Sequence, residues 1–323
     1  MPTTYLITGG AGNLACRLTH ALAGRSARIV LFDAAERPVA PVAAGCEFLR
    51  GDLRQPDEVQ RLFRQLDCDR EGAAGDLVLV HMASLLSGSS ELNRTVAWRI
   101  NTDATFDLLE ASLRYGVRQF FFPSSVAAFG GRLPSLIGDD QPQWPTSLYG
   151  VCKATVERLG VYFHERHGLD FRCLRLPVVV SPYAPAGAAS AYASRAFIEA
   201  VTKGRFVFRV APETQPSLIY LPDVVQAILS LLDAPADRLS RRVYNIQALS
   251  PTARELAAAI VHRLPRAELR FDPDLDTTRL ISSWPIAFDD SAARTDWGWR
   301  PHFDLESMAD DLVRKIQANE SIC

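Results

Sequence analysis

Tyr149 and Lys153 stand four positions apart within residues 148–167, where the spacing of apolar residues predicts a helix. Residues i and i+4 share one helix face, so the phenol and the ammonium are expected to lie side by side. A free phenol has a pKa of about 10 and is a poor base at neutral pH, but a neighbouring positive charge favours the phenolate and lowers that pKa. The pair therefore predicts an acid–base site in which Tyr149 accepts the proton of an alcohol.

Two further polar positions belong with this pair. Ser124 and Ser125 follow an apolar run that predicts a strand, and a hydroxyl at its carboxyl end, Ser125 in particular, could hold the reacting oxygen beside the phenol. Asn101 lies within a long helical segment, where it could bend the helix and bind a water that returns the proton to solvent. The alternative for Asn101 is an ordinary polar residue on the wetted face of that helix.

A glycine-dense turn, residues 8–12, stands between a predicted strand and a predicted helix close to the N-terminus. Gly9 permits the tight turn, and Gly12 lets the backbone come close to a phosphate. The unpaired amides where the helix begins, at Asn13 and Leu14, would face that anion, and the helix dipole favours it. The turn therefore predicts a dinucleotide whose pyrophosphate lies on the start of the helix.

Acidic residues after the second and third predicted strands indicate which dinucleotide is bound. A carboxylate at Asp33 could accept hydrogen bonds from the adenosine ribose and would repel a 2'-phosphate, which favours NAD over NADP. Arg37 lies close by in sequence and leaves NADP open. Asp52 and Leu53 fall where they could meet the adenine edge, and the alternative for Asp52 is a helix N-cap. With NAD bound, the positive nicotinamide would join Lys153 in lowering the pKa of the phenol, and Lys153 could bind the nicotinamide ribose.

These residues must be positioned by an alternating series of strands and helices. That order predicts an α/β fold with a doubly wound, parallel Rossmann sheet, in which cofactors lie at the carboxyl ends of the strands. Strands are expected at residues 5–8, 28–33, 47–50, 77–81, 119–123 and 171–180, and helices at 13–23, 57–66, 96–115 and 148–167.

The alternation stops after residue 180, where a loop rich in proline and glycine begins. Beyond it, the sequence predicts a smaller C-terminal lid that holds substrate over the nucleotide. We expect an NAD-binding domain of residues 1–176 and 217–247 and a substrate-binding domain of residues 177–216 and 248–323. Further helices are expected at 192–202, 221–232, 252–262 and 305–316, and strands at 206–210 and 243–246.

Composition excludes several classes of protein. The chain has 323 residues and a formal net charge of −2, which gives no reason to expect nucleic acid or an anionic membrane as a partner. It has no apolar run long enough for a membrane span and no signal-like segment before the first strand, so we expect a cytoplasmic protein. The six cysteines are scattered, with no CxxC pair, so neither a metal site nor a disulfide framework is expected.

The motifs together resemble the extended short-chain dehydrogenase/reductase family (the NAD-dependent epimerases and dehydratases). The resemblance rests on the glycine turn, Asn101, Ser125, Tyr149 with Lys153, and two further segments at 81–84 and 174–177. It implies that Ser125 is the catalytic serine. It also implies that the cofactor is lined by Met82, Ala83, Ser84 and Pro177, and that the chain forms a homodimer through the helices at 96–115 and 148–167.

A narrower resemblance concerns two branches of that family. Segments at 167–175, 282–285, 289–291, 296–299 and 303–308 are similar to L-threonine 3-dehydrogenases, and so is Ser87, which the likeness places on substrate. Those enzymes carry Gly-Gly-Gly-Thr-Thr-Asp-Tyr where this chain has residues 186–192, so Ala189 and Ala191 replace a threonine and the aspartate. The alanine-rich loop, which includes Ser190, is more similar to D-erythronate dehydrogenases, enzymes of a four-carbon sugar acid.

Other conspicuous residues favour packing roles. His81 ends a buried strand, Arg175 is expected to brace the fold although it could bind a substrate carboxylate, and Trp284 could either pack the lid or touch substrate. The sequence thus predicts an NAD-dependent oxidation of a secondary hydroxyl in a small polar hydroxy acid, either L-threonine-like or a four-carbon sugar acid. The alternatives are a nucleotide-sugar 4-epimerase or dehydratase with tightly bound NAD, and a non-catalytic NAD(H) sensor.

Overall fold

Seven parallel strands form one sheet in the order β11-β7-β5-β4-β1-β2-β3, the doubly wound arrangement that the sequence predicts. The computed structural model describes residues 3–25, 27–68, 76–184 and 191–318. Because helices cover both faces of the sheet, its central strands are apolar along nearly their whole length. The strands are β1 (Thr4–Thr8), β2 (Arg28–Asp33), β3 (Glu47–Arg50), β4 (Leu77–His81), β5 (Gln119–Ser125), β7 (Asp170–Leu176) and β11 (Val243–Asn245).

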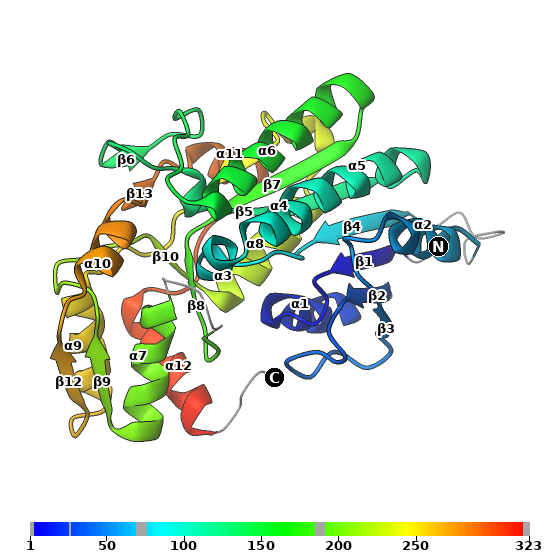
Figure 1. The fold of residues 1–323 in the computed structure, drawn as a ribbon. Helices are drawn as coiled ribbons and strands as arrows, with labels where there is room; N and C mark the ends of the chain where they lie inside the picture. The colour runs from blue at the N-terminus through cyan, green and yellow to red at the C-terminus, as the bar shows by residue number, and fades with distance from the viewer. Residues whose placement is uncertain (1–2, 26, 69–75, 185–190, 319–323) are drawn as a thin grey trace.

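Two groups of helices form the outer layers (Figure 1). On one face lie α2 (Pro56–Cys68), α5 (Ala104–Arg114) and α6 (Leu148–His167), and on the other α1 (Asn13–Ala23), α8 (Leu221–Asp233) and α11 (Ser291–Trp297). The predicted bounds of α1 and α6 are confirmed to the residue. Local signals set the ends of α6, since the Ser147 side chain accepts a hydrogen bond from Gly150 and the helix ends at Gly168 with φ +72°.

The strand predicted over residues 171–180 is wrong in its extent. It is divided at Pro177, which has no amide hydrogen for the sheet and turns the chain out of it. β7 stays in the large sheet, whereas β8 (Val178–Val180) pairs with β10 (Leu218–Tyr220) in a separate two-stranded sheet. Pro177 therefore marks the point where the chain leaves the nucleotide-binding sheet.

The helix predicted over residues 96–115 is present as a continuous helical stretch over residues 94–114, but it is not a regular α-helix throughout. The segment contains α4 (Arg94–Trp98), a π-helical turn (Arg99–Asp103) and α5, and it is preceded by an unpredicted helix, α3 (Ser87–Leu92). The π turn contains Asn101, whose side chain bonds the backbone of Leu85. Such turns are frequent at functional sites, and this one brings α3 and the segment after β4 toward the same edge of the sheet.

A second lobe follows the sheet and carries its own core (Figure 1). Long-range pairs of very short strands join its parts, and the sequence predicts none of these pairings. The lobe contains α7 (Tyr192–Lys203), α9 (Ala253–Arg263), α10 (Leu275–Ser282), α12 (Leu305–Gln317), β6 (Leu136–Ile137) paired with β13 (Ala287–Phe288), and β9 (Arg205–Phe208) paired with β12 (Glu268–Phe271).

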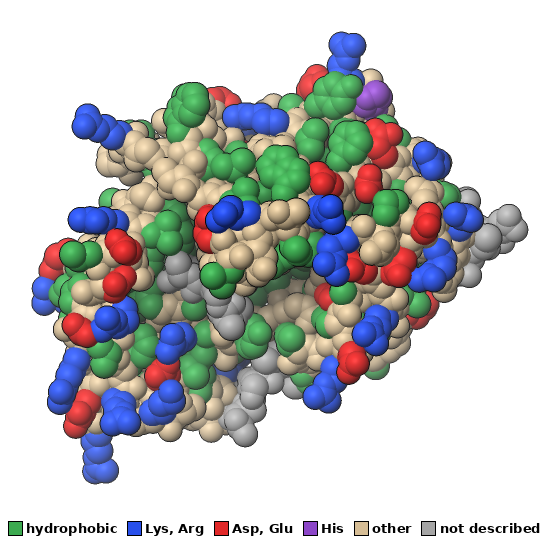
Figure 2. Space-filling model, viewed as in Figure 1, with side chains coloured by type: hydrophobic (Ala, Val, Ile, Leu, Met, Phe, Trp, Pro, Cys, Tyr) green, Lys and Arg blue, Asp and Glu red, His purple; other side chains and the backbone are tan. Residues whose placement is uncertain are grey.

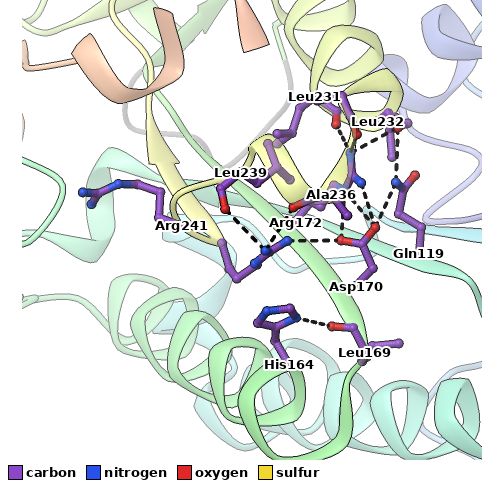
Figure 3. Close-up of polar contacts among 12 residues, drawn as sticks. Gln119, His164, Leu169, Asp170, Arg172, Leu231, Leu232, Ala236, Leu239 and Arg241 are labelled. Carbon is purple, nitrogen blue, oxygen red and sulfur yellow. Dashed lines mark hydrogen bonds and ion pairs between the residues drawn. The ribbon is translucent and has the colours of Figure 1, made fainter. Parts of the chain in front are cut away.

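A buried arginine fastens α8 to the edge of the sheet (Figure 3). The Arg172 guanidinium donates to the carbonyls of Leu231 and of Ala234, the latter at 2.7 Å, at the C-terminal end of α8. Asp170 accepts from the same guanidinium at 2.7 Å. A cation is favoured at a helix C-terminus, so this contact both caps α8 and fixes it against β7.

No helix within the described parts of the chain is long and apolar enough to cross a membrane. Among the described residues, no three His, Cys, Asp or Glu side chains are grouped so that they could hold a metal ion. The cysteines recorded as free thiols are Cys16, Cys46, Cys152 and Cys173.

Candidate active site

The glycine turn has the geometry that the sequence predicts. Gly9 adopts φ +69°, and a Cβ at this position would lie 2.5 Å from the backbone nitrogen of Ala83. A side chain is therefore excluded both by backbone conformation and by the close approach of the segment after β4. The amide of Gly12 donates to the Gly9 carbonyl at 3.0 Å and closes the turn immediately before α1.

The start of α1 fits a dinucleotide pyrophosphate. No side chain caps the helix, and no acidic residue occupies its first turn, so the free amides can serve an anion. The side-chain oxygen of Asn13 is buried and lacks a hydrogen-bond partner among the described residues. Buried acceptors are normally hydrogen-bonded, so we expect a donor group of a ligand to bind this oxygen. Gly12, Asn13 and Leu14 all face one cavity.

The N-terminal end of α6 brings Tyr149 to the end of β5. A 3-10 turn (Val126–Ala128) follows Ser125 directly, and a Cβ on Gly150 would collide with the carbonyl of Ala127. The absence of a side chain at Gly150 therefore permits α6 to pack against this turn. Ser125 accepts a hydrogen bond from the Ala127 amide at 3.2 Å, and its hydroxyl lies close enough to the Tyr149 phenol to lower the pKa of that group.

Lys153 is close to Tyr149 but bonds a different group. Its Nζ donates to the Pro123 carbonyl at 2.6 Å, and it lies 5.4 Å from the centroid of the Tyr149 ring. The same ammonium stands 4.3 Å from the centroid of Phe122. β5 and α6 thus hold the lysine rigidly beneath the phenol, as the four-residue spacing predicts.

The expected lowering of the phenol pKa is wrong for the protein without its cofactor. Burial raises the pKa of Tyr149 to about 12, and the Ser125 hydroxyl lowers it only in part. Burial also lowers the pKa of Lys153 to about 8. Removal from water disfavours the charged form of both groups, and burial is the largest cause of each shift.

One cavity of about 390 Å³ joins the glycine turn to the tyrosine. It opens at the carboxyl ends of β1 and β5, which is where a doubly wound sheet binds its ligand. Most of the residues that the sequence predicts for the site line it: Gly9, Gly12, Asn13, Leu14, Met82, Ser84, Ser87, Ser125, Tyr149, Lys153, Pro177 and Trp284. Ala189 and Ser190, also predicted, lie outside the described residues.

Asn101 is buried behind the cavity and does not line it. Its Oδ1 accepts from the Leu85 amide at 2.8 Å and from the Ser84 hydroxyl at 3.1 Å, and its Nδ2 donates to the Leu85 carbonyl at 3.0 Å. The side chain therefore positions the segment that leads into α3. The expectation that Asn101 binds a water that returns the proton to solvent stays a prediction.

The residues predicted for the adenosine half lie outside this cavity. Asp33 accepts hydrogen bonds from the amides of Ala11, at 3.0 Å, and Ala35, at 2.9 Å, so its carboxylate lies at the glycine turn. Asp52 bonds Arg54, and it is not the N-cap of α2, which begins at Pro56. Leu53 packs in the core and Ala83 lies against Gly9. Roles for Asp33, Asp52 and Leu53 in holding adenosine, and for Ala83 in lining the cofactor, stay predictions.

Two packing interpretations agree with the structure. His81 is buried between the hydroxyls of Thr8, at 2.6 Å, and Thr105, at 2.8 Å, and burial lowers its pKa to about 3. Arg175 is buried against Glu157 with an Nη2–Oε2 distance of 2.8 Å, so it braces β7 against α6. Neither side chain lines the cavity.

The sequence analysis missed several residues that complete the cavity. Gly150 could have been recognised from the sequence, because a glycine within the helix that carries Tyr149 and Lys153 indicates that another segment of the chain packs closely against that helix. Other missed positions come from chain segments whose proximity depends on the long-range pairing of β8 with β10. The missed lining residues include Val39, Leu86, Ser181, Tyr183, Ser194 and Leu221, whereas Ala191, which the sequence analysis singled out, does line the cavity.

A parallel dinucleotide-binding sheet with serine, tyrosine and lysine in one cavity defines the class of the short-chain dehydrogenases. Comparison with known proteins agrees: residues 5–246 match the NAD dependent epimerase/dehydratase family. The chain belongs to that family, and the predicted resemblance to the extended short-chain dehydrogenases is confirmed.

Individual relatives are L-threonine dehydrogenases. The mitochondrial L-threonine 3-dehydrogenase of Bos taurus is 35% identical over 314 residues, which cover 95% of this chain and 81% of that protein. The solved L-threonine dehydrogenase from Clostridium difficile has a TM-score of 0.89 at 30% identity and covers 100% of this chain and 99% of its own. The solved L-threonine dehydrogenase from Phytophthora infestans has a TM-score of 0.88 at 33% identity, and the match covers 98% of this chain and 100% of that chain. This chain is accordingly an NAD-dependent dehydrogenase.

Proposed function

We propose that this dehydrogenase oxidises a secondary hydroxyl of a small polar hydroxy acid, either L-threonine-like or a four-carbon sugar acid. The observation that carries the proposal is the single cavity in which Tyr149, Lys153 and Ser125 adjoin the glycine turn. NAD, when bound there, supplies the acceptor for the hydride. The pyrophosphate site lies at Gly12 and Asn13, and Lys153 is positioned to bond a ribose hydroxyl.

The residues of the chain handle the proton of the substrate. Ser125 orients the substrate oxygen, and Tyr149 accepts its proton once the phenol has become a phenolate. A buried ammonium at Lys153 lies close enough to stabilise that negative charge, since its Nζ is 5.4 Å from the ring centroid. Asn101 supports the site from behind by holding the segment at Leu85, and we retain for it the return of the proton to solvent.

The test is NADH formation with a panel of short hydroxy acids that includes L-threonine and D-erythronate. The variant Tyr149→Phe should lose turnover by about 10²-fold or more, because the ring remains but the proton acceptor is gone. It should keep its affinity for NAD, measured by thermal shift. The proposal would be refuted by a folded wild-type protein that binds NAD but forms no NADH with any acid of the panel.

The nucleotide-sugar alternative is disfavoured by the charges of the cavity. A nucleoside diphosphate carries two phosphates, which proteins commonly hold with arginine, yet Lys153 is the only cation among the described lining residues. An epimerase of this kind keeps NAD bound between turnovers. Release of stoichiometric NAD on denaturing the purified protein, with epimerisation of a UDP-sugar, would favour that alternative.

We also propose a homodimer built on α4, α5 and α6. These helices expose large apolar side chains, Trp98, Phe106, Val151 and Tyr162, and hydrophobic groups gather on the upper part of the face in Figure 2. A contiguous apolar patch of this kind marks an interface. One similar solved structure is titled a monomeric L-threonine 3-dehydrogenase, so light scattering of the wild type and of Phe106→Arg decides between the two states.

A cytoplasmic location and the division into two domains complete the proposal. The bovine and porcine relatives are named mitochondrial, so cell fractionation is the test of location. The division assigns residues 1–176 and 217–247 to NAD and the remainder to substrate. Limited proteolysis with and without NAD tests it, because NAD should protect the first set of residues more than the second.

A further inference from the structure

The substrate end of the cavity has an unusual balance of charge. Among the described residues that line it, Lys153 alone is charged, and none is a carboxylate. No acidic side chain among the described lining residues is therefore available to a ligand in the cavity.

The polar groups that face the ligand are neutral hydroxyls. Ser87 begins α3, lines the cavity and has no hydrogen-bond partner among the described residues. Ser194 and Ser181 are engaged with each other through the backbone, since the Ser181 amide donates to the Ser194 hydroxyl at 3.1 Å. Ser87 can thus both donate to and accept from a substrate hydroxyl.

An ammonium group on the substrate would have no counter-charge in this cavity. It would lose its hydration, find hydroxyls only, and share a small enclosed space with the ammonium of Lys153. A hydroxyl at the same position would lose far less free energy of hydration, and it could form a hydrogen bond with the Ser87 hydroxyl. We propose that the cavity selects acids that carry a hydroxyl, and not an ammonium, on the carbon next to the carboxylate, so that its substrates are sugar acids and not amino acids.

Ala191 is the position at which a substitution is expected to change this choice of substrate. It lines the cavity and directly precedes α7, where a carboxylate is favoured by the helix dipole. Ala191→Asp adds a carboxylate to the lining at little cost to the helix. Ala191→Asn adds a side chain of nearly the same shape without the charge and is the matched control.

The inference rests on the proposed function and is tested with a matched pair of substrates. L-threonine is compared with the 2,3-dihydroxybutanoate of the same configuration, which differs only in a hydroxyl in place of the ammonium. For the wild type, kcat/KM should be about 100-fold or more higher for the dihydroxy acid. Equal values, or a preference for L-threonine, would overturn the inference while leaving the proposed function standing. Turnover of neither acid, while another acid of the panel is oxidised, would overturn the inference alone. No turnover across the whole panel, with NAD bound by thermal shift, would overturn the proposed function and this inference with it.

The variants test the role of position 191. Ala191→Asp should move the ratio of the two kcat/KM values toward L-threonine by about tenfold or more, and Ala191→Asn should leave it near the wild-type ratio. If Ala191→Asp binds NAD normally and keeps the wild-type ratio, or if Ala191→Asn shifts the ratio equally, charge at this position does not control the choice. The comparison of the two substrates on the wild type stands by itself should the aspartate variant fail to fold.

Discussion

Replacing Glu157 by glutamine should show that the buried ion pair beneath the active site carries a large share of the stability. The Glu157 side chain is fully buried, and its partner Arg175 is 3% exposed. The carboxylate accepts from the Arg175 Nη2 at 2.8 Å, from the Ser124 hydroxyl at 2.5 Å and from the Gln143 amide at 2.8 Å. Glu157→Gln removes the charge, keeps the shape and leaves the buried guanidinium of Arg175 with only the carboxylate of Asp139, which it does not contact directly, as a counter-charge.

Breaking one member of a buried pair costs about 3–5 kcal/mol. Unfolding entropy is about 2.1 cal/mol/K per residue, so for the 323 residues of the chain it is about 0.7 kcal/mol/K. A loss of about 4 kcal/mol therefore lowers Tm by about 6 °C. Thermal melts followed by circular dichroism, or urea unfolding, measure the change.

Two controls separate charge burial from other effects. Glu213→Gln removes the same charge from an exposed pair with Arg254 and should cost less than about 1 kcal/mol. The double replacement Glu157→Leu with Arg175→Met removes both charges and should cost less than Glu157→Gln alone, because no unpaired ion is left buried. A Glu157→Gln variant within about 1 kcal/mol of the wild type would refute the reasoning.

Three other perturbations have clear expectations. Arg172→Met should cost about 3 kcal/mol in urea unfolding, because it uncaps the C-terminal carbonyls of α8 and leaves Asp170 with its longer ion pair to Arg242, at 3.5 Å, in the largely buried cluster of Figure 3. Gly12→Ala should weaken NAD binding at least about tenfold, since the added methyl occupies phosphate space. It should cost the free protein only about 1 kcal/mol, because φ at Gly12 is −73° and the one close neighbour, the Gly9 carbonyl at 3.1 Å, need move only slightly. The neutral imidazole of His81, with a pKa of about 3 when folded and about 6.5 when unfolded, should cost about 2 kcal/mol of stability as the pH falls from 6.5 to 5. The unfolded chain binds the proton that the folded chain refuses, so His81→Gln should flatten this part of the pH–stability curve.

Local signals explain why the sheet could be predicted from the sequence. β2, β3 and β4 end where expected because short apolar runs are bounded by turn residues, and α6 ends at a glycine that adopts the left-handed conformation. The carboxyl ends of parallel strands meet at one edge, so the glycine turn and Ser125 could be placed in one site without knowledge of any contact. Spacing on a single helix then placed Tyr149 and Lys153 together.

Elements that depend on distant partners could not be predicted. β6 and β13 are two residues each, and they pair only because the chain folds Leu136–Ile137 against Ala287–Phe288. Neither run is long enough to show a period of its own. The π turn at Asn101 is similarly decided by a contact, with Leu85, that no helical pattern records. For the same reason the place of Ser181 and Ser194 in the cavity lining could not be predicted.

The state of the tyrosine shows what the free protein lacks. Spacing alone predicts that an ammonium one turn away makes the phenol acidic, but burial raises the pKa of Tyr149 to about 12 and lowers that of Lys153 to about 8. At neutral pH both groups therefore hold their protons, and the cavity contains no base. A second positive charge close to the ring would favour the phenolate, and the nicotinamide of NAD, bound in the cavity that joins the glycine turn to Tyr149, would supply one. We therefore expect Tyr149 to accept a proton from the alcohol only when NAD occupies the cavity.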